Sequence, residues 1–257
     1  MLWIRAVIFV GISLLVETTP LKSYRIVGGV EACPHSLPYQ VALILDRLNF
    51  CGGVLVSTTH VLTAAHCVSQ NPTIEVVLGA HNLGQYEETQ IVIYDPIIIV
   101  HENFSASELK NDIALLKLKH HIQLSAAVMP VALVGEDDDL SGCSGVLSGW
   151  GLTSYADNHM QNKLRKVSVE VLTDRMCISY LNSNGLSDPK SYVCTGGFDT
   201  VFGAVGACFG DSGGPLVVKN SLIGLVSFGD ETCEYGQPTV FTSISYYRNW
   251  INKFSGI

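Results

Sequence analysis

The chain has 257 residues, of which 47% are hydrophobic, and it carries a formal net charge of −8 with an isoelectric point near 5.4. This length and apolar content suffice for one large hydrophobic core or two of moderate size. The acidic balance argues against nucleic acid as a partner, because phosphate binding requires a basic surface.

The N-terminus has the features of a secretory signal peptide. Arg5 precedes an apolar run from Ala6 to Val16, which has about the length of a signal h-region and is too short to span a bilayer comfortably. We therefore expect a signal peptide over residues 1–18 and a secreted, extracellular protein with no membrane association. A buried N-terminal helix is the alternative, but no amphipathic pattern continues the run.

Short apolar and β-branched runs, separated by Gly, Pro, Asn and Asp, occupy most of the remaining chain. Many short strands at regular spacing are typical of closed all-β barrels. The predicted strands are Tyr39–Leu45, Gly53–Val56, Ile74–Leu78, Gln90–Ile93, Ile97–Val100, Ala114–Leu118, Gly145–Gly149, Val167–Val171, Pro215–Val218 and Leu222–Phe228. The pattern changes at the end, where residues 245–254 predict a helix with Tyr247, Trp250, Ile251 and Phe254 on one face.

Three motifs carry chemistry, in the chain order His, Asp, Ser. Ser212 stands among glycines in Gly210-Asp211-Ser212-Gly213-Gly214-Pro215. A serine hydroxyl is a weak nucleophile at neutral pH, so it needs a base for its proton and N–H donors for the oxyanion. The motif Thr63-Ala64-Ala65-His66-Cys67 offers an imidazole as the base. Asp112, at the start of an apolar run, offers a carboxylate to orient that imidazole.

These motifs and the segment Arg25-Ile26-Val27-Gly28-Gly29 resemble those of the trypsin/chymotrypsin family of serine proteases, over essentially all of residues 26–254. Each motif alone has an ordinary structural explanation, but four in the right order are specific. Within the family, the chain is similar to the chymotrypsin-like digestive or secreted enzymes of arthropods. The resemblance implies an all-β fold of two packed six-stranded antiparallel β-barrels, about 26–134 and 135–257, with a C-terminal helix and the site in the cleft between the barrels.

The resemblance also implies a serine endopeptidase, a hydrolase that cleaves peptide bonds through an acyl-enzyme. His66, Asp112 and Ser212 would be its catalytic residues, and the backbone N–H groups of Gly210 and Ser212 would form the oxyanion hole. Protein and peptide substrates and protein protease inhibitors are the expected partners of a monomer. The alternative is a non-catalytic homologue acting as a binding module, which would be expected to lack one of the three catalytic residues; all three are present.

The bond between Arg25 and Ile26 indicates a zymogen with a short propeptide over residues 19–25. By resemblance, a trypsin-like protease would cleave after Arg25. The new ammonium at Ile26 would then fold inward and pair with Asp211, which orders the oxyanion hole.

Eight cysteines in an exported chain indicate disulfides, because no Cys-x-x-Cys pair or clustered His supports a zinc site. By resemblance, the bonds would be Cys51–Cys67, Cys177–Cys194 and Cys208–Cys233. Parity then predicts a fourth disulfide between Cys33 and Cys143, with intermolecular pairing as the alternative.

The resemblance also places the substrate pocket. Gly206 would form its floor, Gly229 and Thr239 its walls, and Phe209 an apolar rim, while the segment Ser227-Phe228-Gly229 would pair with an extended substrate. Trypsins hold Lys or Arg with a carboxylate at the floor, and Gly206 offers none, so a basic side chain would be buried without a partner. We expect cleavage after Leu, Met, Phe or Tyr, in the chymotrypsin-like to elastase-like range.

The sequence also bears on the charge of the pocket, on metal binding and on glycosylation. A carboxylate of Asp230, Glu231 or Glu234 that swings toward the pocket would admit some Arg or Lys. No cofactor and no metal are expected, because Glu87 and Glu88 alone make a poor calcium cage. Asn103-Phe104-Ser105 is a glycosylation sequon, so we expect a glycoprotein modified at Asn103.

Overall fold

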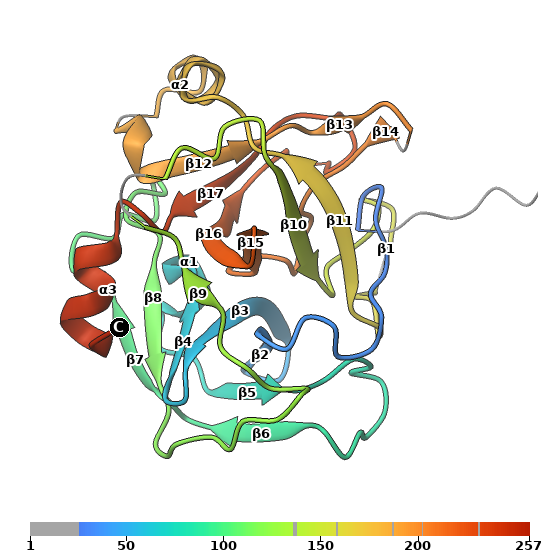
Figure 1. Ribbon diagram of the computed structural model, residues 1–257, viewed down its shortest axis with the longest axis vertical. Helices are drawn as coiled ribbons and strands as arrows, with labels where there is room; N and C mark the ends of the chain where they lie inside the picture. Colours follow the sequence, from blue (N-terminus) through green and yellow to red (C-terminus); the bar gives the residue numbers. More distant parts are fainter. Residues whose placement is uncertain (1–25, 136–137, 158, 187, 202, 231) are drawn as a thin grey trace, which may run out of the picture.

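The computed structural model describes residues 26–257 except 136–137, 158, 187, 202 and 231. The expected signal peptide, the propeptide with Arg25, and Glu231 therefore lie outside the described residues. Two curled β-sheets pack against each other, and a C-terminal helix lies on the flank of the sheet formed by the first half of the chain (Figure 1). Within the described part of the chain, no helix is long and apolar enough to cross a membrane.

The first sheet closes into a barrel through one bent strand. Its antiparallel order is β6-β5-β2-β3-β4-β8-β7. β6 and β7 follow each other directly and are separated at Asp95, which has φ of 50°, and by Pro96, which lacks an N–H. One end of this bent strand pairs with β5 and the other with β8, so six strand positions surround the core. The strands are β2 (Gln40–Leu45), β3 (Asn49–Ser57), β4 (His60–Thr63), β5 (Ile74–Leu78), β6 (Ile91–Tyr94), β7 (Ile97–Val100) and β8 (Ala114–Lys117).

The second barrel has the antiparallel order β11-β10-β15-β16-β17-β12. A bridge between Val171 and Thr195 joins the ends of β11 and β12 and closes it. Each barrel has its own apolar interior, with Leu43 and Leu55 fully buried in the first and Leu147 and Phe241 fully buried in the second. The strands are β10 (Ser144–Gly149), β11 (Arg165–Glu170), β12 (Tyr192–Thr195), β15 (Pro215–Val218), β16 (Ser221–Phe228) and β17 (Thr239–Ser243).

Two short strands from the first half of the chain join the second barrel. β1 (Val30–Glu31) pairs with β11, and β9 (Ala132–Leu133) pairs in parallel with β16. Ile26 itself is fully buried in an apolar cluster to which both barrels contribute. Pairing between Val30 and Lys166 is long-range in sequence, so no local pattern reports it.

The helices are short and lie around the barrels. The C-terminal helix, predicted over 245–254, is α3 (Arg248–Ser255), with Trp250 and Ile251 buried and Gly256 in the left-handed conformation at its end. The elements that the sequence did not predict include β4, β12 and β17. The others are β1, β9, α1 (Ala65–Val68), α2 (Asp174–Ser183), a 3-10 turn at Pro189–Ser191 and the hairpin of β13 (Phe198–Asp199) and β14 (Gly203–Ala204).

Three disulfides join Cys51 to Cys67, Cys177 to Cys194 and Cys208 to Cys233. The expected Cys33–Cys143 disulfide is wrong in this structure, where both thiols are free. The N–H of Ala32, beside Cys33, bonds to Leu164, whereas the carbonyl of Cys143 accepts from Val171. The two cysteines therefore lie at opposite ends of β11, about 23 Å apart along a strand, whereas a disulfide requires Cα atoms within about 7 Å.

Candidate active site

Local structure fixes the position of His66. The short helix α1 follows β4 immediately, and the disulfide Cys51–Cys67 ties it to β3. Thr63, at the end of β4, is buried and donates its hydroxyl to the carbonyl of Gly52 at 2.8 Å. His66 is therefore held by the first barrel on two sides.

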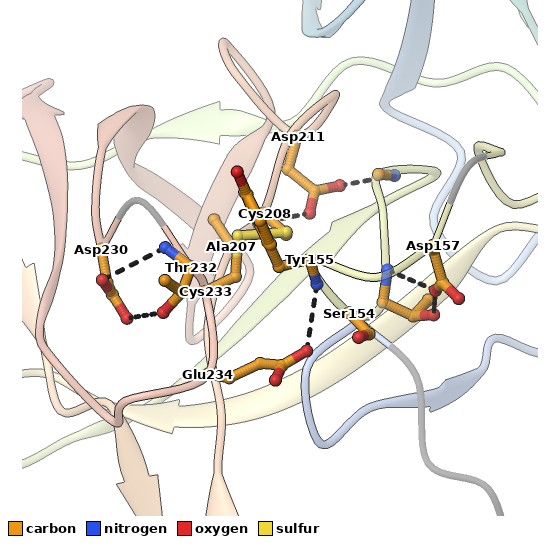
Figure 2. The surroundings of a disulfide bond; sticks show 12 residues. Ser154, Tyr155, Asp157, Ala207, Cys208, Asp211, Asp230, Thr232, Cys233 and Glu234 are labelled. Carbon is orange, nitrogen blue, oxygen red and sulfur yellow. Dashed lines mark hydrogen bonds between the residues drawn. A yellow bond between two sulfur atoms is a disulfide. The ribbon is translucent and has the colours of Figure 1, made fainter.

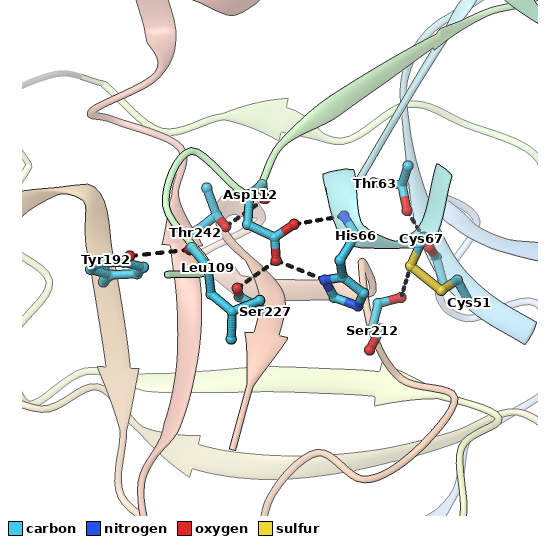
Figure 3. A network of polar contacts seen from close by, with 11 residues as sticks. Cys51, Thr63, His66, Cys67, Leu109, Asp112, Tyr192, Ser212, Ser227 and Thr242 are labelled. Atoms are coloured by element: carbon cyan, nitrogen blue, oxygen red, sulfur yellow. Dashed lines mark hydrogen bonds and ion pairs between the residues drawn. A yellow bond between two sulfur atoms is a disulfide. The ribbon is translucent and has the colours of Figure 1, made fainter. Parts of the chain in front are cut away.

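Asp112 precedes β8 and is 1% exposed. Its Oδ2 accepts from Nδ1 of His66 at 2.8 Å and from the hydroxyl of Ser227 at 2.6 Å, while Oδ1 accepts from the backbone N–H of His66 at 2.9 Å (Figure 3). Thr242 donates to the backbone carbonyl of Asp112 at 2.7 Å. Because a carboxylate only accepts, Nδ1 carries the imidazole proton and Nε2 is left as the proton acceptor.

Two opposing influences act on the imidazole of His66. Burial, the larger single influence, disfavours the charged ring, but the hydrogen bond and the charge of Asp112 together outweigh it and hold the pKa of His66 above its ordinary value. The ring therefore accepts a proton more readily than an isolated imidazole does. This is the property that a general base beside a hydroxyl requires.

Ser212 comes from the second barrel, in the turn before β15. Its carbonyl accepts from the N–H of Gly52 in β3 at 2.7 Å, so the two barrels meet at this residue. Gly213 has φ of 75°, and a Cβ there would collide with the Thr63 hydroxyl and lie 2.7 Å from the carbonyl of Gly52. Figure 3 shows the Ser212 side chain on the side of the imidazole away from Asp112.

The neighbouring Asp211 points inward and is fully buried. Its carboxylate accepts from the N–H groups of Gly151 at 2.9 Å and Cys208 at 3.0 Å (Figure 2). Burial raises the pKa of Asp211 to about 7 in spite of these bonds. Within the described part of the chain, the N–H groups of Gly210 and Ser212 make no hydrogen bond, which leaves both available to an oxyanion.

The three residues expected to shape the substrate pocket come together. Thr239 is 3% exposed, and its Oγ1 accepts from the N–H of Ala207 at 3.3 Å. A Cβ added at Gly206 would lie 2.8 Å from this hydroxyl, and one at Gly229 would lie 3.9 Å from it. Thr239 therefore lies close to both Gly206 and Gly229. The disulfide Cys208–Cys233 joins the loop that follows Gly206 to the loop that follows Gly229.

The carboxylates of Asp230 and Glu234, near this pocket, are engaged in hydrogen bonds with loop residues. Asp230 accepts from the Thr232 hydroxyl at 2.8 Å and from the N–H of Tyr235 at 3.1 Å. Its desolvation opposes ionisation, but these bonds outweigh it and lower the pKa of Asp230. Glu234 accepts from the N–H of Tyr155 at 3.0 Å (Figure 2). Neither side chain is free to swing while these bonds hold.

The rest of the predicted substrate-binding segment divides into two roles. Ser227 uses its side chain on Asp112, a contact that the sequence did not reveal, because it joins residues far apart in the chain. Phe228 packs edge-on against Tyr192, with ring centroids 6.0 Å apart. A groove of about 580 Å³ runs beside Phe228 and Gly229. It is also lined by residues 107–110, Tyr180 and residues 184–186.

Phe209 and the predicted modification site are both exposed. Phe209 is 54% exposed, and its ring lies 6.4 Å from that of Tyr155, another exposed aromatic residue. Asn103 is exposed in the loop after β7. Phe209 therefore has the exposure expected of an apolar rim, and Asn103 that of a glycan acceptor.

Three residues of types that bind metals lie together at the site, with their ligand atoms within 4.8 Å of one another: Cys51, His66 and Cys67. Both sulfur atoms belong to the Cys51–Cys67 disulfide, and a metal requires thiolate. These three residues therefore cannot hold an ion as a set. Glu87, one of the two glutamates judged from the sequence to make a poor calcium cage, accepts hydrogen bonds from the backbone N–H groups of His81 at 2.6 Å and Asn82 at 3.1 Å.

The sequence profile of the Trypsin family matches residues 26–251. The chain is 39% identical to brachyurin of Leptuca pugilator over 90% of its length and 99% of that protein. It is 34% identical to chymotrypsin of Phaedon cochleariae over 91% of its length and 83% of that protein, and 36% identical to chymotrypsin-C of Bos taurus over 91% of its length and 90% of that protein. The chain is a serine endopeptidase and belongs to the trypsin family of serine proteases.

Proposed function

We propose that this endopeptidase cleaves peptide bonds after Leu, Met, Phe or Tyr. The observation that carries the proposal is the pocket built from Gly206, Gly229 and the buried Thr239, in which no described carboxylate is free to meet a basic side chain. A buried cation without a partner costs several kcal/mol, so cleavage after Lys or Arg should be weak. The Thr239 methyl and hydroxyl shorten the pocket, which disfavours Trp.

In the proposed reaction, the Ser212 hydroxyl attacks the peptide carbonyl while Nε2 of His66 takes its proton. Asp112 holds the imidazole in the required tautomer and stabilises the imidazolium. The N–H groups of Gly210 and Ser212 donate to the oxyanion, and the imidazolium then gives its proton to the leaving amine. Water, deprotonated by the same imidazole, attacks the acyl-enzyme and releases Ser212.

The groove beside Phe228 and Gly229 supports an extended peptide as the substrate. It continues from the Gly229 wall of the pocket along Phe228 toward residues 107–110. A peptide laid along the segment Ser227-Phe228-Gly229 can pair with its backbone while side chains enter the groove. Protein inhibitors that present an extended loop would occupy the same surface.

We also propose that the protein is secreted as a zymogen that a trypsin-like protease activates after Arg25. Ile26 is fully buried, and Val27 forms a β-bridge with Gly206 in the pocket floor, so the activation segment is tied directly to the site. A free ammonium at Ile26 would supply the positive charge that the fully buried Asp211 lacks among its described contacts. The exposed Asn103 would carry a glycan in the secretory pathway.

Peptide-library cleavage profiling of the chain processed after Arg25, with Ser212→Ala as the control, tests the specificity. We expect cleavage after Leu, Met, Phe and Tyr, and none in the control. Dominance of Arg over the apolar residues would contradict the proposal. Activation is tested separately, since an Arg25→Gln chain as active as the processed enzyme would exclude the zymogen mechanism.

A further inference from the structure

Asp112, the carboxylate that contacts His66, lies at the centre of a tight three-residue turn. The N–H of Ile113 donates to the carbonyl of Asn111 at 2.8 Å, which closes the turn around Asp112. The direction of the Asp112 side chain therefore depends on how the two ends of this turn are held. Ile113 is fully buried in the apolar cluster that both barrels share, so packing fixes its end. The other end is Asn111, which is only partly buried and needs a different support.

The backbone of Asn111 is left-handed, with φ of 51°. Asparagine is one of the few residues with a side chain that tolerate this conformation. An alanine at this position would be strained, whereas a glycine would not. The residue type at position 111 therefore helps to form the turn that presents Asp112.

Both polar atoms of the Asn111 side chain are also held. Nδ2 donates to the backbone carbonyl of Asn103 at 2.8 Å, and Oδ1 accepts from the hydroxyl of Tyr247 at 2.9 Å. Because a carbonyl only accepts, the contact with Asn103 identifies Nδ2, and Tyr247 must be the donor to the other atom. Tyr247 directly precedes α3, is 3% exposed and belongs to the same apolar cluster as Ile113. Its hydroxyl therefore reaches Asn111 from a fixed position.

A second tyrosine holds the segment that leads into this turn. Tyr192, at the start of β12, donates its hydroxyl to the carbonyl of Leu109 at 3.1 Å (Figure 3). Leu109 is also left-handed, with φ of 50°. Such conformations persist in residues other than glycine only when their surroundings enforce them. The segment before Asp112 thus bends through two left-handed residues, and a tyrosine hydroxyl from the second half of the chain holds each of them.

We propose that Asn111 and Tyr247 are positioning residues, which set the direction of the Asp112 carboxylate and, through it, the orientation of His66. This inference rests on the proposed reaction, in which Asp112 holds the imidazole. Loss of these contacts would let Asp112 turn away from Nδ1 of His66, which it contacts at 2.8 Å. A misplacement of about 1 Å in a catalytic group can lower the rate about 100-fold. Because the contacts act on the chemical step, their loss should reduce kcat and leave KM unchanged.

Tyr247→Phe is the sharpest test, because it removes one oxygen atom and keeps the buried ring. In the chain processed after Arg25, kcat should fall about 2–10-fold, the effect of one hydrogen bond, at unchanged KM. Tyr246→Phe is the matched control, since it removes the neighbouring hydroxyl, which donates to Asp188, and should leave kcat unchanged. Asn111→Ala should lower kcat about 10–100-fold, and Asn111→Gly should recover part of that loss because glycine accepts the left-handed backbone.

The NMR resonance of the Nδ1 proton of His66 reports the same geometry without turnover. In the Ser212→Ala background, Tyr247→Phe and Asn111→Ala should shift or broaden this resonance, whereas Tyr246→Phe should leave it in place. A Tyr247→Phe enzyme with the kcat and the resonance of its parent would overturn the proposal. An Asn111→Gly enzyme no more active than Asn111→Ala would overturn it as well. An inactive parent enzyme would instead refute the proposed reaction, and the resonance would still decide this inference.

Discussion

Asp112 receives hydrogen bonds from both barrels, and this explains how one buried carboxylate can hold the imidazole of His66 firmly. Two donors come from His66 itself, one from Ser227 in β16, and Thr242 in β17 holds the Asp112 backbone. A buried carboxylate is stable as an anion only when its lone pairs are satisfied. Each contact that stabilises the charge of Asp112 therefore also preserves the alignment of His66.

Asp112→Asn should move the acidic limb of the kcat/KM profile to lower pH. His66 must be neutral to accept a proton, and in the native enzyme Asp112 holds the pKa of His66 above its ordinary value against the effect of burial. Without the negative charge, burial remains and the pKa falls. Turnover should drop by roughly 10⁴, because the imidazole loses the partner that holds its reactive tautomer. A pH profile of the residual activity measures the limb; an unmoved limb would show that Asp112 does not set the pKa.

Thr239→Gly should shift the preference toward larger aromatic side chains. It removes a methyl and a hydroxyl that stand between Gly206 and Gly229. A change of one such group alters discrimination by about 1–3 kcal/mol, so kcat/KM for Phe and Trp substrates should rise relative to Leu by a graded amount. Thr239→Ser is the matched control, because it keeps the hydroxyl that accepts from Ala207. Equal Phe-to-Leu ratios in all three proteins would exclude Thr239 from the pocket.

At the scale of elements, the sequence predicted strands where apolar residues dominate and missed them where buried polar residues replace them. Ile74–Leu78, Ile97–Val100 and Pro215–Val218 were predicted with their observed bounds. β17 was missed because Thr239, Thr242 and Ser243 give it a loop-like composition, although all three are buried. Their hydroxyls are satisfied by contacts such as that of Thr242 with Asp112, which depend on the tertiary fold.

Cys33 and Cys143 should both react as free thiols with a thiol reagent. β11 separates them, so the chain unfolded without reductant should release two thiols per molecule to a thiol reagent. The Cys33→Ser/Cys143→Ser double variant should keep the native free energy of unfolding. By contrast, the Cys177→Ala/Cys194→Ala variant loses a disulfide and about 2–4 kcal/mol. If no thiol reacts, the prediction of two free thiols is wrong and a fourth disulfide is indicated instead.

At the scale of the whole molecule, the site forms between the two barrels, from residues that are far apart in the chain. The motifs around His66, Asp112 and Ser212 could be predicted because each is a local pattern. The residues that hold these three in place could not be predicted, because Ser227, Thr242 and Gly52 form their hydrogen bonds to Asp112 and Ser212 across the interface between the barrels. For the same reason, the sequence did not place Ile26 in the apolar cluster that both barrels share. Long-range pairing leaves no periodic signal in the residues that make it.

The buried Asp211 should make the uncleaved chain less stable as the pH rises. Burial raises its pKa to about 7 from 3.8, so between these values the folded chain holds a proton that the unfolded chain has released. Stability is therefore unaffected by this group below about pH 4 and falls as the pH rises to 7. Above that, the loss is on the order of 4 kcal/mol.

Urea unfolding of an Arg25→Gln/Ser212→Ala precursor at pH 5 and pH 8 measures this loss, with Asp211→Asn in the same background as the control. The carboxamide does not ionise, so the difference in unfolding free energy between the two proteins should change with pH, and the Asp211 protein should lose more at pH 8. In a Ser212→Ala chain that keeps Arg25, cleavage after Arg25 should remove that difference, because the Ile26 ammonium would then neutralise the charge. If both precursors lose equal stability, Asp211 is not an uncompensated buried acid.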